Sequence, residues 1–164
     1  MSAGSTVVVT GGGGFVGGGL VRALLARGHR VRAVQRGRYE ELEALARGGA
    51  LEIVRGDLAD PDVMLRAAEG AEGVFHVAAK AGVWGAYADY YRSNVSATEN
   101  VLAACRARGV AKLVYTSTPS VVHAGHDVAG VDESAPYAER FETAYPETKA
   151  IAERMVLAAN EDEL

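Results

Sequence analysis

Short apolar runs rich in β-branched residues alternate with longer helical patterns, and this alternation restricts the fold more than any other feature of the sequence. Strands are expected at 6–10, 31–35, 51–55, 73–77 and 112–116. Helices are expected at 15–27, 39–47, 62–69, 87–108 and 145–160, with a loop-rich segment at 119–142. Such alternation is typical of a parallel sheet with helices on both faces. The strand runs are continuously apolar, as expected when both sheet faces are buried.

The expected architecture is therefore an α/β, doubly wound parallel sheet, formed as one domain over residues 1–164. In such sheets the ligand binds in the crevice at the carboxyl ends of the strands. Thr10, Gln35, Asp57, Ala78 and Thr116 all come at those ends. The candidate chemistry is thus expected along a single edge of the sheet.

A G-x-x-G-x-x-G spacing directly follows the first expected strand and opens a helix. Glycine permits a tight turn with positive φ, and it lets the backbone approach a pyrophosphate closely. The free N–H groups and the helix dipole then favour an anion. This context predicts a Rossmann-like NAD(P)-binding domain, the alternative being a merely flexible turn. The residues assigned to the cofactor here are Gly11, Gly14, Phe15, Val16 and Gly17.

The end of the second expected strand indicates which dinucleotide is preferred. An acidic residue there binds the ribose 2′-OH, whereas a nearby arginine accommodates a 2′-phosphate. This chain has Gln35 at that point, followed by Arg36 and Arg38. A guanidinium suits a phosphate, so NADP(H) is favoured and NAD(H) is the alternative. Asp57, after the third strand, is a candidate acceptor for the adenine amino group or else an Asx-turn residue.

Tyr145 and Lys149 form a Y-x-x-x-K element at the start of the last expected helix. Tyrosine is a poor acid or base at neutral pH, but a lysine one helical turn away favours the phenolate. Tyr145 is therefore the candidate proton donor and acceptor, and Lys149 also the candidate ligand of the nicotinamide ribose. Ser117 and Thr118, just past the fifth strand, are candidates to orient the substrate oxygen. Asn94 either joins a water relay or packs its helix.

The bulk properties exclude several classes of function. The chain has a net charge of −4 and no basic cluster that would favour binding of a nucleic acid. No apolar run approaches the length of a membrane span. Cys105 is the one cysteine and is expected in the core, which fits a reducing, cytoplasmic location. His123 and His126 lie in a glycine-containing loop without further ligands, so no metal site is expected.

These motifs together resemble the extended short-chain dehydrogenase/reductases, in the branch of 3β-hydroxysteroid dehydrogenases and NAD-dependent epimerases/dehydratases. Within the branch, two stretches look like bacterial 2-alkyl-3-oxoalkanoate reductases; these are 78–85 and 115–122. The stretches that support the family resemblance are 10–17, 56–58, 75–79, 94–102, 113–118 and 145–149.

The resemblance implies that Thr118 matches the family's Ser/Thr partner of the tyrosine. It also implies that Asp57 and Leu58 meet the adenine and that Ala78 and Ala79 line the cofactor path. Family members are about twice as long, so the resemblance implies that this is the N-terminal part, without the C-terminal strands and the substrate domain. An apolar surface left exposed in such a part would favour self-association as a homodimer.

The expected function is an NADP(H)-dependent oxidoreductase that interconverts a 3-keto and a 3-hydroxy group on a lipid-like or steroid-like small molecule. One alternative is a nucleotide-sugar epimerase or dehydratase that keeps NAD tightly bound. Another, suggested by the length of the chain, is an NAD(P)-binding module without catalysis. Net oxidation of NADPH by a 3-oxo compound would separate these hypotheses.

Overall fold

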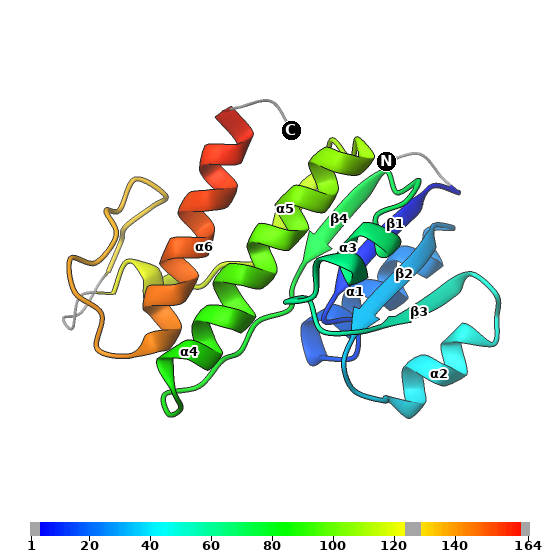
Figure 1. The fold of residues 1–164 in the computed structure, drawn as a ribbon, viewed down its shortest axis with the longest axis horizontal. Helices are drawn as coiled ribbons and strands as arrows, with labels where there is room; N and C mark the ends of the chain where they lie inside the picture. Colours follow the sequence, from blue (N-terminus) through cyan, green and yellow to red (C-terminus); the bar gives the residue numbers. More distant parts are fainter. Residues whose placement is uncertain (1–3, 124–128, 162–164) are drawn as a thin grey trace.

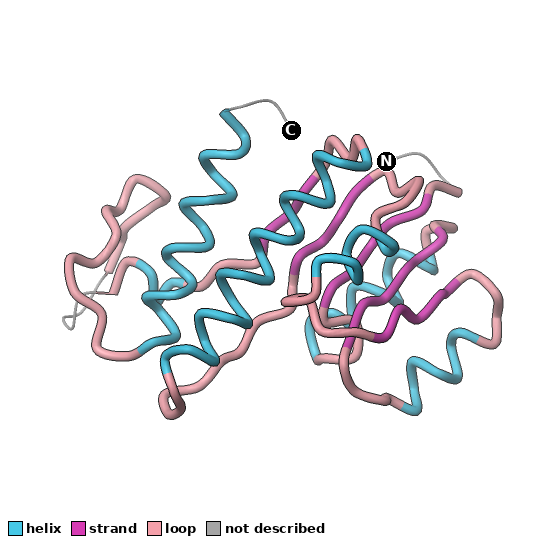
Figure 2. The backbone as a smooth tube through the Cα atoms, viewed as in Figure 1, coloured by secondary structure: helices cyan, strands magenta, loops and turns pink. Residues whose placement is uncertain are grey.

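A computed structural model describes residues 4–123 and 129–161, which form a five-stranded sheet flanked by helices (Figures 1 and 2). The strands are β1 (Thr6–Thr10), β2 (Arg30–Gln35), β3 (Leu51–Arg55), β4 (Gly73–His76) and β5 (Leu113–Tyr115). The helices are α1 (Phe15–Ala26), α2 (Glu40–Ala46), α3 (Pro61–Ala67), α4 (Tyr87–Tyr90), α5 (Ala97–Arg108) and α6 (Ala144–Glu161). These bounds agree with the sequence-based expectation to within two residues at most ends.

All five strands are parallel and their order is β3-β2-β1-β4-β5. The chain leaves β1 toward β2 and later returns to the other side of β1 with β4. The strand order therefore reverses between β1 and β4, and such a switch point is where doubly wound sheets bind their ligands. The expected Rossmann-like fold is confirmed.

Side chains of alternate residues along β1 pack into two separate cores. Val8 faces α3 and α5, where it meets Met64 and Val101 in a buried cluster. Val7 and Val9 face α1 and α2, and pack there with buried aliphatic side chains of those helices. Burial on both faces explains why the strands read as continuous apolar runs. Cys105 belongs to the first core, and burial raises the pKa of its thiol to about 11.

The long helix expected at 87–108 is present, but it is not α-helical throughout. A π-helical segment, η1 (Tyr91–Ser96), joins α4 to α5. The sequence pattern does not predict this, because a π turn changes the hydrogen-bonding register without a helix-breaking residue. Such segments are frequent at functional sites. Helix α6 packs against η1 and lies beside α5 (Figure 1).

The segment expected as a loop at 119–142 begins with a short 3₁₀ turn, η2 (Pro119–Val121). The hydroxyl of Thr118 accepts a hydrogen bond from the Ser120 amide and so caps this turn. His126, assigned above to a loop, lies outside the described residues, whereas His123 lies within them. Across residues 4–123 and 129–161, the structure contains no helix long and apolar enough to cross a membrane.

Candidate active site

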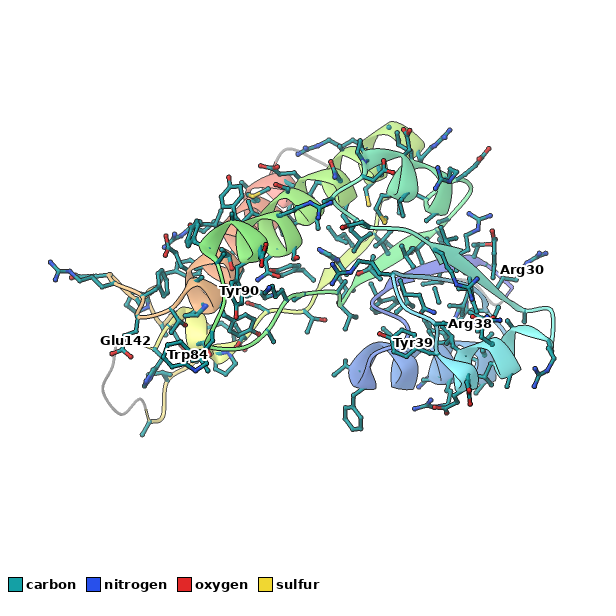
Figure 3. The ribbon with its side chains drawn as sticks, turned by 60° about the horizontal axis from the view of Figure 1, so that its bottom comes forward. Arg30, Arg38, Tyr39, Trp84, Tyr90 and Glu142 are labelled. Carbon is teal, nitrogen blue, oxygen red and sulfur yellow. The ribbon has the colours of Figure 1, made fainter. Side chains whose placement is uncertain are left out.

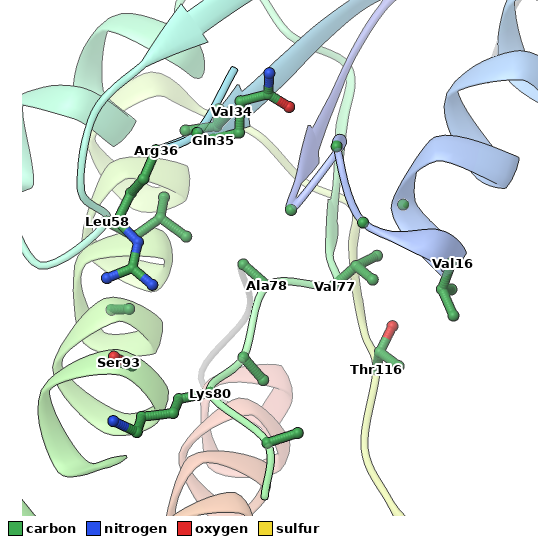
Figure 4. A pocket seen from close by; sticks show the side chains of 18 of the residues that line it. Val16, Val34, Gln35, Arg36, Leu58, Val77, Ala78, Lys80, Ser93 and Thr116 are labelled. Atoms are coloured by element: carbon green, nitrogen blue, oxygen red, sulfur yellow. The ribbon is translucent and has the colours of Figure 1, made fainter. Parts of the chain in front are cut away.

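A pocket of about 670 Å³ opens at the carboxyl ends of the strands, around the switch point between β1 and β4 (Figure 4). Its walls come from the glycine loop, the ends of β2 and β3, the residues after β4 and β5, and the start of α6. Most residues assigned from the sequence therefore share one cavity. Those that line it are Gly11, Gly14, Phe15, Val16, Gly17, Arg36, Asp57, Leu58, Ala78, Ala79, Ser117, Tyr145 and Lys149.

The glycine loop has the geometry of an anion cradle. Gly11 has φ of +70°, and a Cβ there would lie 3.0 Å from the backbone of Ala78. A Cβ on Gly17 would lie 2.2 Å from the carbonyl oxygen of Gly11, so only glycine allows α1 to approach the loop. Helix α1 begins after Gly14 with neither a capping side chain nor an acidic residue in its first turn. Its first N–H groups are thus suited to bind a phosphate.

The two arginines after β2 lie in different places. Arg36 lines the pocket and extends toward Ser93 of η1 (Figure 4). Arg38 instead borders a separate surface depression beside Glu40 and Glu43, close to α2 (Figure 3). Gln35, at the end of β2, also lines the pocket, and its exposed fraction is 6%. Neither polar atom of its amide has a hydrogen-bond partner within the described residues.

Asp57 is held by two interactions at the adjoining strand end. One carboxylate oxygen accepts a hydrogen bond from the Ala59 amide at 3.0 Å, which is an Asx turn. The other lies 3.0 Å from the guanidinium of Arg92 on η1. The Asx turn foreseen as an alternative is therefore present. A carboxylate has lone pairs beyond these two contacts, so the side chain keeps the capacity to accept from a ligand.

Tyr145 and Lys149 stand one turn apart on α6, and both line the pocket. Lys149 is 3% exposed, and its ammonium donates to the carbonyl oxygen of Thr116 at 2.6 Å. The same ammonium lies 4.0 Å from the ring centroid of Tyr115, a cation–π distance. Burial lowers the pKa of Lys149 to about 8, while the charge of Glu153 acts in the opposite direction. This end of the pocket therefore contains half-buried Tyr145 and, one helical turn away, the buried ammonium of Lys149.

Three consecutive hydroxyls follow β5, and they are engaged differently. The Thr116 side chain lines the pocket on the side of Val16 (Figure 4). The Ser117 hydroxyl donates to the carboxylate of Glu153 on α6. The Thr118 hydroxyl lies outside the pocket lining, and it donates to the Ser120 hydroxyl at 3.2 Å.

His76 stands beneath the pocket in a chain of hydrogen bonds that determines its protonation state. Thr10 Oγ1 accepts from the amides of Val77 and Ala78, so its own proton is directed to His76 Nδ1 at 2.7 Å. His76 Nε2 then donates to Thr98 Oγ1 at 3.0 Å, and Thr98 donates to a backbone carbonyl of η1. Burial lowers the pKa of His76 to about 3, with a smaller contribution from Lys149. The imidazole is therefore neutral, and it orients the Thr10 hydroxyl that binds the segment after β4.

Asn94 connects the pocket wall to α6. Its amide oxygen accepts from the backbone N–H of Lys80 at 2.7 Å, and its amide nitrogen donates to the Lys80 carbonyl at 3.1 Å. The same nitrogen donates to the Thr148 hydroxyl at 3.0 Å. All the polar atoms of this side chain are thus used in packing contacts. These contacts agree with the helix-packing interpretation of Asn94, while the water relay stays a prediction.

Several lining residues were not assigned from the sequence. Tyr39 packs its ring against Gly13, where a Cβ would lie 2.1 Å from that ring. Ser93 and Lys80 reach the pocket from η1 and from the segment after β4. Thr116 could have been assigned to the pocket from the sequence, because it stands at the carboxyl end of an expected strand. No local pattern indicated Tyr39 or Ser93, because each reaches the pocket only through the way α2 and η1 pack in the fold.

Comparison with known proteins agrees with this geometry. The model of the 3-beta hydroxysteroid dehydrogenase/isomerase family matches residues 8–164. A 2-alkyl-3-oxoalkanoate reductase of Stenotrophomonas maltophilia (strain K279a) is 52% identical over 160 residues, covering 96% of this chain and 47% of that protein. A 3 beta-hydroxysteroid dehydrogenase/Delta 5-->4-isomerase of Mycobacterium tuberculosis (strain ATCC 25618 / H37Rv) is 45% identical over 161 residues. This match covers 94% of this chain and 42% of that protein.

Among solved structures, a UDP-glucose-4-epimerase from Stenotrophomonas maltophila with bound NAD superposes with a TM-score of 0.86 at 27% identity. That match covers 98% of this chain and 50% of the other. The chain spans about half the length of the curated relatives it matches. The resemblance inferred from the motifs is thus confirmed at the level of sequence and of fold. The chain belongs to the 3-beta hydroxysteroid dehydrogenase/isomerase family.

Proposed function

We propose that the protein is an NADP(H)-dependent oxidoreductase that interconverts a 3-keto and a 3-hydroxy group on a lipid-like or steroid-like molecule. One observation carries the proposal: a single pocket joins the glycine loop and Arg36 at one end to Tyr145 and Lys149 at the other. A dinucleotide needs the first end and proton transfer needs the second. The names of the two relatives, a reductase and a dehydrogenase, support the same reaction class.

The pocket residues fit a dinucleotide. The glycine loop leaves space that a Cβ would fill, and α1 presents N–H groups without a protein cap. The unpaired amide of Gln35 is suited to a ribose hydroxyl, because it can both donate and accept. The Arg36 guanidinium is suited to a 2′-phosphate. When bound, the nicotinamide ring supplies or accepts the hydride.

The remaining steps belong to side chains of this chain. In the reducing direction the Tyr145 phenol donates its proton to the substrate oxygen while the carbonyl carbon receives hydride, which gives the alcohol. The reverse direction returns that proton to the phenolate. The Lys149 ammonium stabilises the phenolate and is held for this by the Thr116 carbonyl. Thr118 is proposed to orient the substrate oxygen once its hydroxyl turns away from Ser120.

An apolar substrate is supported by the surface beyond the catalytic end. Val83 and Trp84 precede α4 and are 65% and 90% exposed. Tyr87, the first residue of α4, donates to Glu147 on α6 at 3.1 Å and so links this surface to the catalytic helix. Exposed aromatic and aliphatic side chains near a polar reaction centre suit a substrate with one polar end.

The neighbouring arginines provide the sharpest test. We expect Arg36→Ala to weaken NADPH binding at least tenfold and to leave NADH binding nearly unchanged, as measured by fluorescence titration. Arg38→Ala is the matched control, since its side chain lies outside the pocket. Equal NADPH affinities in wild type and Arg36→Ala would refute the cofactor preference. Oxidation of NADPH by a long-chain 3-oxo substrate would then test the reaction itself.

A nucleotide-sugar epimerase is the second candidate, because the solved epimerase with bound NAD has the same fold over nearly the whole chain. Such an enzyme would retain NAD through purification and show no net oxidation. Binding of cofactor without turnover by either route would favour a non-catalytic NAD(P)-binding module. Absorbance of the purified protein and of the reaction mixture distinguishes the three.

A further inference from the structure

Helix α6 forms side-chain hydrogen bonds with two consecutive residues of the chain after β5. The Lys149 ammonium donates to the carbonyl oxygen of Thr116 at 2.6 Å. One helical turn later, the carboxylate of Glu153 accepts a hydrogen bond from the Ser117 hydroxyl. Residues four apart lie on one face of a helix, so both contacts come from the same side of α6. A cation holds the backbone and an anion holds the next side chain.

Glu153 is also in contact with the segment that precedes α6. The Tyr137 hydroxyl donates to its carboxylate, and burial followed by the charge of Glu153 raises the pKa of that phenol. The guanidinium of Arg154 lies 4.2 Å from the Tyr137 ring centroid. Glu153 is thus the point at which the end of β5, the preceding segment and the catalytic helix meet.

The charges around Lys149 give the carboxylate a second role. The groups that interact with the ammonium are the Tyr115 ring on β5, neutral His76 on β4 and Glu153 on its own helix, and Tyr145, one turn earlier, lines the same pocket. Among these groups Glu153 is the one with a full negative charge. It therefore offsets part of the cost of burying the ammonium.

We propose that Glu153 is a positioning residue, which fixes the Thr116–Thr118 segment on α6 through Ser117 and balances the charge of the Lys149 ammonium. The proposal rests on the proposed function for the role of that segment in catalysis. It also decides between the candidate hydroxyls. A hydroxyl has a single proton, and that of Ser117 is given to Glu153, so the substrate oxygen is left to Thr118 or Thr116.

The chain offers a direct test, because Lys80, Lys112 and Lys149 are its three lysines. Carbon-13 NMR of the lysine ε-carbons follows their titration without cofactor or substrate. Glu153→Gln retains an oxygen that can accept from Ser117 and removes the charge. We expect the Lys149 midpoint to fall from about 8 to about 7.5 or lower, as for a unit charge roughly 6 Å away under water-like screening.

Glu147→Gln is the matched control, since this carboxylate lies on the same helix but accepts from Tyr87. It should leave the Lys149 midpoint where it is in the wild type. An unchanged midpoint in Glu153→Gln, or an equal shift in Glu147→Gln, would overturn the proposal. NADPH binding measured on the same samples tests the proposed function separately, because the lysine titration requires no cofactor.

A second variant keeps the proposal testable if Glu153→Gln does not fold. Ser117→Ala removes the hydrogen bond to Glu153 and changes no charge. The Thr116 amide donates to the His76 carbonyl at 3.0 Å, and we expect its hydrogen exchange to accelerate about tenfold in this variant. Ser134→Ala is its control, because that hydroxyl also donates to a carboxylate, that of Asp132, which is not on α6. Equal exchange rates of the Thr116 amide in wild type and Ser117→Ala would contradict a positioning role for the hydrogen bond between Ser117 and Glu153.

Discussion

The buried, neutral His76 should make the fold sensitive to mild acid. Its pKa is about 3 in the folded protein and near 6.5 in an unfolded chain. Between these values the unfolded state binds the proton and the folded state does not. Stability therefore falls as the pH falls through 6.5, and the loss continues to about pH 3.

The magnitude follows from the two pKa values. At about pH 4.5 the unfolded histidine is protonated and the folded one is not, which corresponds to two pH units below 6.5. At 1.36 kcal/mol per unit, the loss is about 3 kcal/mol relative to neutral pH. His76 is 1% exposed, so solvent does not screen this contribution.

His76→Asn is the perturbation that isolates this contribution. An asparagine oxygen can still accept from Thr10, although the contact with Thr98 is lost and the variant should be less stable at every pH. Urea unfolding at about pH 7 and about pH 4.5 gives the acid-induced loss for each protein. We expect the loss in the variant to be smaller than in the wild type by about 2–3 kcal/mol.

His29→Asn is the control, because it removes another histidine and leaves the Thr10–His76–Thr98 chain of hydrogen bonds intact. This variant should keep the acid-induced loss that His76 contributes. If His76→Asn loses as much stability as the wild type on acidification, the histidine is not the buried neutral group described here, and the reasoning is refuted.

Three further outcomes are expected. Tyr145→Phe should lower turnover by about 10²–10⁴ while NADPH affinity, measured by titration, is unchanged, and equal activity would exclude the phenol as the proton donor. Lys149→Met should raise stability near neutral pH by about 2 kcal/mol, because holding the buried ammonium costs about 3 kcal/mol net of the opposing effect of Glu153, and the hydrogen bond to Thr116 contributes roughly 1 kcal/mol. Since folded Lys149 loses its proton at about pH 8 and the unfolded residue near 10.5, wild-type stability should rise with pH across that window and the variant's should not, as urea unfolding can show. A double-mutant cycle of Asn94→Leu and Thr148→Val should give a coupling of about 1 kcal/mol in the free energy of unfolding, and simple additivity would contradict the hydrogen bond between these two side chains.

The sequence alone determined the order and type of the main elements. Each strand and helix is encoded by residues within a few positions of one another, through periodicity, capping and turn chemistry. The glycine spacing and the Y-x-x-x-K element are local in the same sense, so the glycine loop and the pair Tyr145 and Lys149, which line one pocket, could be picked out from the sequence. The strand order follows almost as directly, because parallel strands joined by helices have few permitted connections.

The tertiary structure decided how chemically equivalent residues are used. Arg36 and Arg38 have the same side chain two positions apart, and only the path of the chain after β2 places one of them in the pocket. Ser117 donates to Glu153, 36 positions later, which no local pattern encodes. The π-helical register likewise sets where Asn94 points, and its partner Thr148 is 54 positions away. Hydrogen bonds of this kind depend on how whole elements cross, so they become visible only when the chain is folded.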